Sequence, residues 1–311
     1  MKKILITDSL FIFPEHEEKI RAAGYEIERL DKPEATPEEL KAALKDKVGY
    51  VLGGIEHVTE DVLREATELK AISFTGIGYK DLIPAWEYAT EKGIAIANVP
   101  DGPTHAVSEW AIGMAIAMNR GFFDTGLAGE KVFNTTRGLE DQNIGIIGLG
   151  RIGSHISEMI KVFRPKSVSY YSKNRKDYKE KELNLQYKEL NNLLKESDVV
   201  FVCVSKDAGE NFIAEKELSQ IKDNSLLVSF MHPGIVNENA LLKELQSGRL
   251  RAVSDNPAKS DEFKNLPFAN WYSMNGSNAF NTYTELKLTS DMATDSIINL
   301  LKNGEDKYKV N

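Results

Sequence analysis

The sequence predicts an α/β fold built from two doubly wound parallel sheets. Segments typical of strands alternate with segments typical of helices in two series, as in parallel sheets joined by crossover helices. The chain has 311 residues, enough for two domains that each bury a core. A glycine-rich turn at 148–153 follows an apolar strand at the start of the second series, which marks a second sheet.

The first series occupies about the first hundred residues. Its strands are expected at 3–6, 25–30, 50–52, 71–74 and 94–98, and its helices at 15–22, 37–44, 60–68 and 86–92. Residues 103–120 then predict one long bridging helix, with Pro103 near its first turn. Residues 121–141 are expected to form a loop.

The second series starts at Ile144. Its strands are expected at 144–147, 167–171, 199–204, 226–230, 252–254 and 271–273, and an amphipathic helix at 152–163. The last helical pattern, 283–301, has no strand after it and is expected to pack on the first domain. Neither series contains an internal repeat.

The glycine turn predicts a site for a dinucleotide pyrophosphate. Gly148 would permit the tight turn, Gly150 the approach of a phosphate to the backbone, and Gly153 the close packing of helix on strand. The N-terminus of the following helix offers unpaired N–H groups to an anion. The alternative is a glycine-rich turn without a ligand.

The residues after the next strand favour NADP(H) over NAD(H). An acidic residue normally stands there to bind the adenosine ribose, but this chain has Ser172. Lys173, Arg175 and Lys176 follow and supply cations where a 2′-phosphate would lie, and arginine can bind it as a bidentate fork. The alternative is a solvated basic loop in a chain that accepts NAD(H).

Composition excludes several other functions. Hydrophobic residues make up 41% of the chain and its net charge is −8, a balance that argues against a nucleic-acid partner. The longest apolar run, 110–118, is about half a membrane span, so no membrane partner is expected. The single cysteine, Cys203, lies in an apolar strand and is expected to be buried. The expected location is cytoplasmic.

Motifs spread along the chain resemble those of the D-2-hydroxyacid dehydrogenases of the phosphoglycerate dehydrogenase type. They are TGIGYKD at 75–81, GIAIANVP at 93–100, AVSEW at 106–110, the glycine turn, ESDVV at 196–200 and GIVNENAL at 234–241. The resemblance implies a flavodoxin-like substrate domain, residues 1–102 and 282–311, around an inserted Rossmann-type NAD(P)-binding domain, residues 103–281. It also implies a homodimer, a small-molecule substrate and an NAD(P)-dependent dehydrogenase or reductase acting on CH–OH donors.

Candidate site residues follow from the glycine turn and from this resemblance. The substrate is expected to contact Gly54, Ile77, Gly78 and Asn275. The cofactor is expected to contact Thr104, Gly148, Gly150, Arg151, Ile152, Gly153, Ser172, Lys173, Arg175, Val204, Ser205 and Asp255.

The chain departs from the family at the catalytic positions. Such enzymes use an arginine to clamp the keto acid, a histidine to exchange a proton with its oxygen, and a glutamate to hold that histidine. The chain has His232 and Pro233 where the family has Arg-Gly, and the glutamate position falls at or near Ala258. The family's histidine would lie within 273–280, but no histidine occurs after His232.

Two hypotheses account for these departures. In the first, a reductase with a rearranged acid-base site uses His232 as proton donor or carbonyl polariser, because histidine can give up a proton near neutral pH. Asn275 or Asn278 would then bind a substrate oxygen, and 2-keto acids or related carbonyl compounds would be substrates. In the second, the chain is a catalytically silent dinucleotide sensor or partner-binding protein, and His232 only caps a loop.

The other histidines suggest no further site. His16 and His57 are expected in solvent, as is His155 within the helix after the glycine turn. His105 is expected to cap the bridging helix. No spacing of histidine, cysteine or acidic residues is typical of a metal site.

Overall fold

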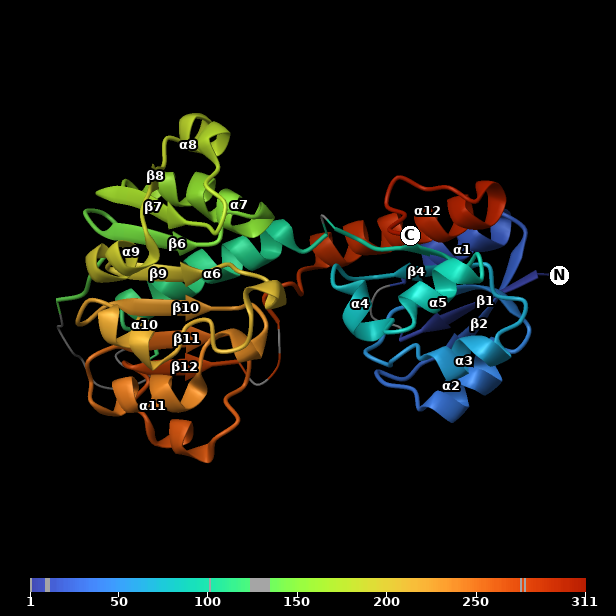
Figure 1. Ribbon diagram of the computed structural model, residues 1–311, viewed down its shortest axis with the longest axis horizontal. Helices are drawn as coiled ribbons and strands as arrows, with labels where there is room; N and C mark the ends of the chain where they lie inside the picture. Colours follow the sequence, from blue (N-terminus) through green and yellow to red (C-terminus); the bar gives the residue numbers. More distant parts are fainter. Residues whose placement is uncertain (1, 9–11, 101, 124–134, 275, 277) are drawn as a thin grey trace. The chain divides into compact units, whose positions relative to one another are not determined.

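The computed structural model describes residues 2–8, 12–100, 102–123, 135–274, 276 and 278–311. The described chain forms two compact units (Figure 1). Unit 1 contains residues up to Pro103 and from Asn281 to Asn311, and unit 2 runs from Thr104 to Phe280. In the described part of the chain, no helix has both the length and the apolar character that a membrane span requires.

Unit 1 has a five-stranded parallel sheet of order β2-β1-β3-β4-β5. This is the flavodoxin-like arrangement. The strands are β1 (Lys2–Thr7), β2 (Tyr25–Leu30), β3 (Lys47–Leu52), β4 (Ala71–Phe74) and β5 (Ala95–Ala97). Every residue of β3 and β4 is buried, as expected of parallel strands covered on both faces.

Helices cover both faces of this sheet. They are α1 (Pro14–Ala22), α2 (Pro37–Leu44), α3 (Glu60–Glu65), α4 (Tyr79–Leu82), α5 (Trp86–Glu91) and α12 (Tyr283–Asn303). One apolar core joins the sheet to α2, α3 and α5, and a second joins it to α1 and α12. Figure 1 shows α12, in red, beside α1, in blue, although the two helices come from opposite ends of the chain.

Unit 2 has a seven-stranded parallel sheet of order β12-β11-β10-β9-β6-β7-β8. This is the Rossmann arrangement extended by one strand. The strands are β6 (Asn143–Ile147), β7 (Ser167–Tyr171), β8 (Gln186–Tyr187), β9 (Val199–Val202), β10 (Leu226–Ser229), β11 (Arg251–Ser254) and β12 (Trp271–Ser273). The two sheets confirm the predicted fold class.

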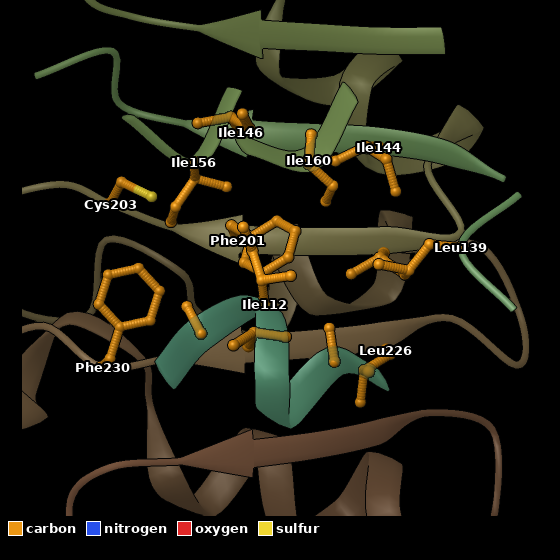
Figure 2. Close-up of a cluster of buried hydrophobic side chains, with 14 of the residues drawn as sticks. Ile112, Leu139, Ile144, Ile146, Ile156, Ile160, Phe201, Cys203, Leu226 and Phe230 are labelled. Atoms are coloured by element: carbon orange, nitrogen blue, oxygen red, sulfur yellow. The ribbon is translucent and has the colours of Figure 1, made fainter. Parts of the chain in front are cut away.

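Helices also cover both faces of the sheet in unit 2. They are α6 (Thr104–Asn119), α7 (Arg151–Met159), α8 (Asp177–Leu183), α9 (Leu190–Glu196), α10 (Glu215–Gln220) and α11 (Glu238–Gln246), with short 3₁₀ helices η1 (Ile160–Phe163), η2 (Lys206–Ala208), η3 (Pro233–Ile235) and η4 (Asp261–Asn265). Figure 2 shows the core between α6 and the sheet, where Ile112 of α6 packs near Phe201 of β9. A second core lies under α9, α10 and α11.

The observed strands and the helices of unit 1 differ from the predicted ones mainly at their ends, whereas the helices α8 to α11 of unit 2 had no predicted ranges. Helix α3 stops at Glu65, because Ala66 leaves the helical region with ψ at 60°. The helix after the glycine turn tightens into a 3₁₀ turn at Ile160 and ends where Arg164 adopts a positive φ of 53°. Strand β8 and helix α4 have too few residues to produce a periodic pattern.

Candidate cofactor and substrate site

The glycine turn connects the carboxyl end of β6 to the N-terminus of α7. Gly148 has a φ of +96°, a conformation that favours glycine. Its N–H donates a 2.7 Å hydrogen bond to the carbonyl of Tyr171, at the end of the neighbouring strand β7. The turn is therefore fixed to the edge of the sheet at which the parallel strands β6 and β7 end.

The other two glycines of the turn differ in the space around them. A Cβ atom on Gly153 would lie 2.0 Å from the carbonyl oxygen of Gly148, so α7 packs against the turn too closely for any side chain. A Cβ atom on Gly150 would have no neighbour within 4 Å. Gly150 is also the N-cap residue of α7. The turn therefore combines close internal packing with an open face at the N-terminus of a helix, the arrangement that suits a phosphate.

Basic side chains surround this open face. The Nζ atom of Lys176 donates a 2.8 Å hydrogen bond to the carbonyl of Leu149, inside the turn. Lys179 of α8 donates to the hydroxyl of Ser154 in α7. Burial lowers the pKa of Lys179, and repulsion from Lys176 and Arg151 lowers it further. We call Arg151, Lys176 and Lys179 the cationic cluster. Its mutual repulsion favours a bound anion.

Arg175 was predicted to bind a phosphate, but in the structure its partner is Glu180. Its guanidinium donates to both carboxylate oxygens of Glu180, at 2.7 and 2.8 Å. This pair, together with the hydroxyl of Tyr170, lowers the pKa of Glu180 to about 2. The fork of Arg175 therefore fixes α8 to the end of β7. Ser172 donates to the carbonyl of Asn174, and Lys173 is exposed.

Further predicted cofactor residues follow the ends of β6, β9 and β11. Ile152 of α7 packs against the core under α6, and Val204 against the core on the opposite face of the sheet. Ser205 donates to Asp207 at the start of η2. Asp255 follows β11 and is 3% exposed. All four residues lie near the carboxyl edge of the sheet, where ligands of open α/β sheets bind.

Asp255 holds the segment that follows β12. Its Oδ1 accepts hydrogen bonds from the backbone N–H groups of Asn278 and Ala279, at 2.9 and 3.1 Å. Burial raises the pKa of Asp255, and the two N–H groups oppose this shift. The side chain of Asn278 donates to the carbonyl of Gly276. Asn275, predicted to contact substrate, lies outside the described residues.

His232 lies in the loop after β10 and is half-buried. Its Nδ1 accepts a 3.2 Å hydrogen bond from the backbone N–H of Gly234, so the ring caps the 3₁₀ helix η3. In the neutral ring this bond leaves the proton on Nε2. The imidazole thus has a fixed tautomer, with Nε2 as a hydrogen-bond donor.

Thr104 begins α6 and has an unsatisfied polar atom. Its Oγ1 is buried without a hydrogen-bond partner, and a buried hydroxyl without a partner is unfavourable. The adjacent His105 contacts His155 of α7, with 2.9 Å between Nδ1 and Nε2. His155 was expected in solvent; its side chain is 30% exposed and also contacts His105. This contact brings the N-terminus of α6 close to α7 and the glycine turn.

The predicted substrate residues of unit 1 follow two neighbouring strands. Gly54 follows β3, and Ile77 and Gly78 follow β4. A Cβ atom on Gly54 would lie 2.6 Å from the backbone carbonyl oxygen of Pro33 and against the carboxylate of the fully buried Glu56, so a side chain does not fit there unless the backbone shifts. The carbonyl of Ile77 accepts from Asn98, and its side chain is 39% exposed. These residues lie at one edge of the sheet of unit 1.

The structure adds two features that the sequence did not reveal. Lys179 belongs to the cationic cluster although it lies in α8, after the basic loop. No sequence motif links a residue at that position to the glycine turn. Glu56 accepts a hydrogen bond from Tyr50, and its Oε2 has no partner. A single acid between Ile55 and His57 carries no sequence signal of burial.

Comparisons with known proteins agree with this geometry. The family model described as D-isomer specific 2-hydroxyacid dehydrogenase, NAD binding domain, matches residues 113–271. A glyoxylate reductase of Thermococcus litoralis is 31% identical over 286 residues, which cover 86% of this chain and 82% of that protein. A D-3-phosphoglycerate dehydrogenase of Methanocaldococcus jannaschii is 30% identical over 82% of this chain, but the match covers only 48% of that protein.

Solved structures share the fold over the whole chain. An NADPH-dependent glyoxylate/hydroxypyruvate reductase from Sinorhizobium meliloti has a TM-score of 0.83 at 21% identity, covering 100% of this chain and 98% of that one. The match of the family model to more than half of the chain, together with the T. litoralis relative, decides the classification. The chain belongs to the D-isomer specific 2-hydroxyacid dehydrogenase family of NAD-binding oxidoreductases.

Proposed function

We propose that this protein is an NADP(H)-dependent reductase with a rearranged acid-base site. It transfers hydride between NADP(H) and a small 2-hydroxy or 2-keto acid, or a related carbonyl compound. The observation that carries the cofactor preference is the cationic cluster around the glycine turn. Residues 103–281 serve as the cofactor domain, and residues 1–102 and 282–311 as the substrate domain.

The residues around the glycine turn fit a dinucleotide. The open face at Gly150 and the N–H groups of the first turn of α7 would hold the pyrophosphate. Lys173 and Lys176 would hold a 2′-phosphate, with Lys179 and Arg151 adding positive charge. The unpaired hydroxyl of Thr104 is a further ligand for the cofactor. When bound, the nicotinamide supplies the hydride.

His232 is proposed to act on the substrate oxygen. Its Nδ1 is engaged by Gly234, which orients the ring and leaves the Nε2 proton as the donor. As a hydrogen-bond donor at Nε2, the neutral ring would polarise a carbonyl group. To give the reduced oxygen its proton, the ring would first take up a second proton from solvent at Nδ1, releasing the Gly234 N–H, and would return to the neutral form after the transfer. This assigns to one imidazole the functions that the family divides between an arginine and a histidine.

Substrate recognition is proposed to use the backbone of unit 1. The loop at Ile77 and Gly78 and the loop at Gly54 follow adjacent strands. Backbone N–H groups in such loops bind carboxylates, and Asn275 or Asn278 would add an amide. Relatives include glyoxylate reductases, which makes glyoxylate and hydroxypyruvate the first compounds to test. We also propose that the protein is cytoplasmic and forms a homodimer.

Steady-state kinetics test this function. The purified protein is assayed with glyoxylate, hydroxypyruvate and a panel of other carbonyl compounds, each with NADPH and with NADH, while cofactor absorbance is followed. We expect turnover with a higher kcat/KM for NADPH. A higher kcat/KM for NADH would overturn the cofactor assignment. Tight NADPH binding by calorimetry without turnover of any compound would favour a silent dinucleotide sensor. The absence of the family's arginine and histidine is also consistent with such a sensor.

A further inference from the structure

A cavity of about 430 Å³ lies at the edge of the unit 2 sheet opposite the glycine turn. Arg251, the first residue of β11, lines it together with Asn224 before β10 and Asn270 before β12. Asn119, the last residue of α6, and Arg137 line its other side. Because the strands are parallel, residues that precede them lie at the amino edge, away from the candidate cofactor site.

Among the described residues, neither arginine of this cavity forms an ion pair, although the charge of Arg137 helps to lower the pKa of Asp198, whose carboxylate pairs with Lys222. Arg251 donates to the side-chain oxygen of Asn119 at 2.8 Å and to the carbonyls of Met118 and Asn224 at 3.4 Å, all of them neutral. Neither Asp nor Glu occurs among the described lining residues. Burial lowers the pKa of Arg251, and repulsion from Arg137 lowers it further.

Three other arginines of unit 2 form ion pairs with acids. Arg164 contacts Glu140 at 2.9 Å, Arg175 contacts Glu180 at 2.7 Å, and Arg249 contacts Glu244 at 2.6 Å. A half-buried guanidinium such as that of Arg251, which has only neutral partners and is repelled by a second arginine, is unfavourable unless an anion is present.

We propose that this cavity is a second binding site, for a small phosphorylated anion. Guanidinium groups match phosphate oxygens with paired N–H donors. Side-chain amides of Asn119, Asn224 and Asn270 offer further hydrogen bonds, and the volume lies within the range of metabolite pockets. This site goes beyond the proposed reductase function, since neither arginine belongs to the cofactor or substrate residues.

Calorimetric titration in phosphate-free buffer tests the site. The probes are inorganic phosphate, inorganic pyrophosphate and glycerol 2-phosphate, which separate a preference for free phosphate from one for an organic phosphomonoester. The full-length wild type is compared with Arg137→Ala, Arg251→Lys, Lys176→Ala in the glycine turn region, and Arg164→Ala on the surface. Circular dichroism and urea unfolding establish that each variant is folded.

We expect at least one probe to bind the wild type, with affinity about tenfold weaker or more in Arg137→Ala and Arg251→Lys. Arg137→Ala removes an exposed side chain and keeps the proposal testable if Arg251→Lys does not fold. Arg164→Ala should bind as the wild type does. The titrations are repeated with saturating NADPH at the glycine turn, which should leave binding at the cavity unchanged. Loss of binding in Lys176→Ala alone would locate the anion at the glycine turn and overturn the proposal. Equal affinity in all variants, or no binding by the wild type, would also overturn it.

Discussion

Lys176 donates its Nζ hydrogen bond to the carbonyl oxygen of Leu149, so a side chain from the loop after β7 reaches into the glycine turn. The backbone N–H of Lys176 also donates a hydrogen bond to the hydroxyl of Tyr170. These two contacts fix a cation beside the open face of Gly150. A sequence scan sees only a basic loop, whereas the structure shows which of its lysines reaches the turn.

Replacing Lys176 by alanine should discriminate between the two cofactors. Loss of one charge-assisted contact to a 2′-phosphate should raise the KM for NADPH about tenfold or more, while the KM for NADH changes little. Lys181→Ala on the exposed side of α8 is the control, and it should leave both constants unchanged. Equal effects of Lys176→Ala on the two cofactors would mean that this lysine does not contact the 2′-phosphate.

The two glycines of the turn should respond differently to alanine. In Gly153→Ala the new methyl group would overlap the carbonyl of Gly148, at 2.0 Å, and lower the free energy of unfolding by about 1–3 kcal/mol or more. Gly150→Ala has open space and should unfold at nearly the wild-type urea concentration. It should instead weaken cofactor binding about tenfold in calorimetry. Wild-type affinity in Gly150→Ala would argue against a phosphate at this face.

Changes at His232 should separate chemistry from cofactor binding. His232→Ala removes the Nε2 donor and should lower kcat about a hundredfold or more. NADPH affinity should be nearly unchanged, because His232 is not among the proposed cofactor ligands. His232→Gln keeps an amide donor and should retain more activity than the alanine variant. Unaltered turnover in His232→Ala would refute the catalytic assignment.

Asp255 should make stability depend on pH. Burial raises its pKa in the folded state above the ordinary value, so between these two values the folded state binds more protons than the unfolded state. Its contribution to stability is therefore present at low pH and is lost as the pH rises through the raised pKa. Asp255→Asn keeps an oxygen for Asn278 and Ala279, and should flatten this part of the profile in urea unfolding between pH 3 and pH 7.

If the wild type instead gained stability over Asp255→Asn as the pH rose, the two backbone N–H bonds would have a larger effect than burial on the pKa of Asp255. Asp255→Ala provides the control for those bonds. It leaves two backbone N–H groups without their acceptor and should lower the free energy of unfolding by about 1–3 kcal/mol at neutral pH.

Glu180 should stabilise the folded state at neutral pH and lose this effect in acid. Its pKa in the folded state is held at about 2 by Arg175 and Tyr170. Its contribution is present above the unfolded-state value near 4.5 and disappears as the pH falls through the folded value. Glu180→Gln should therefore be less stable than the wild type at pH 7, with the difference shrinking toward pH 2. A constant difference across this range would exclude the ion pair as its cause.

The sequence predicted the fold and the glycine turn because both depend on local patterns. Runs of three to six residues typical of strands predicted every strand except β8, and the ranges of β2, β4, β7 and β12 agree with the structure to the residue. Gly148 and Gly153 each have a separate steric reason, and Gly150 leaves the face of the turn open; spacing alone predicts this set. The parallel order of the strands follows from the helices that connect them.

Side-chain partners were harder to predict, because they join residues far apart in the chain. His16 was expected in solvent, but it is 1% exposed and contacts Asp291 of α12 at 2.8 Å. Arg175 was expected to be free for phosphate, but the acid five residues later takes its fork. No periodicity distinguishes such an acid from the other charged residues of α8. Burial of the Cys203 thiol, by contrast, was predicted from its apolar strand and is confirmed.

The core shared by α1 and α12 has a consequence for synthesis. Ile4 and Ile6 pack in one cluster with Ala293 and Ile297, so the first strand and the last helix complete each other. A ribosome delivers these partners almost three hundred residues apart. Unit 2 can close as soon as β12 emerges, while the nascent first hundred residues keep an uncovered apolar face until α12 has emerged. Chaperone contact during that interval should therefore concentrate on the N-terminal segment.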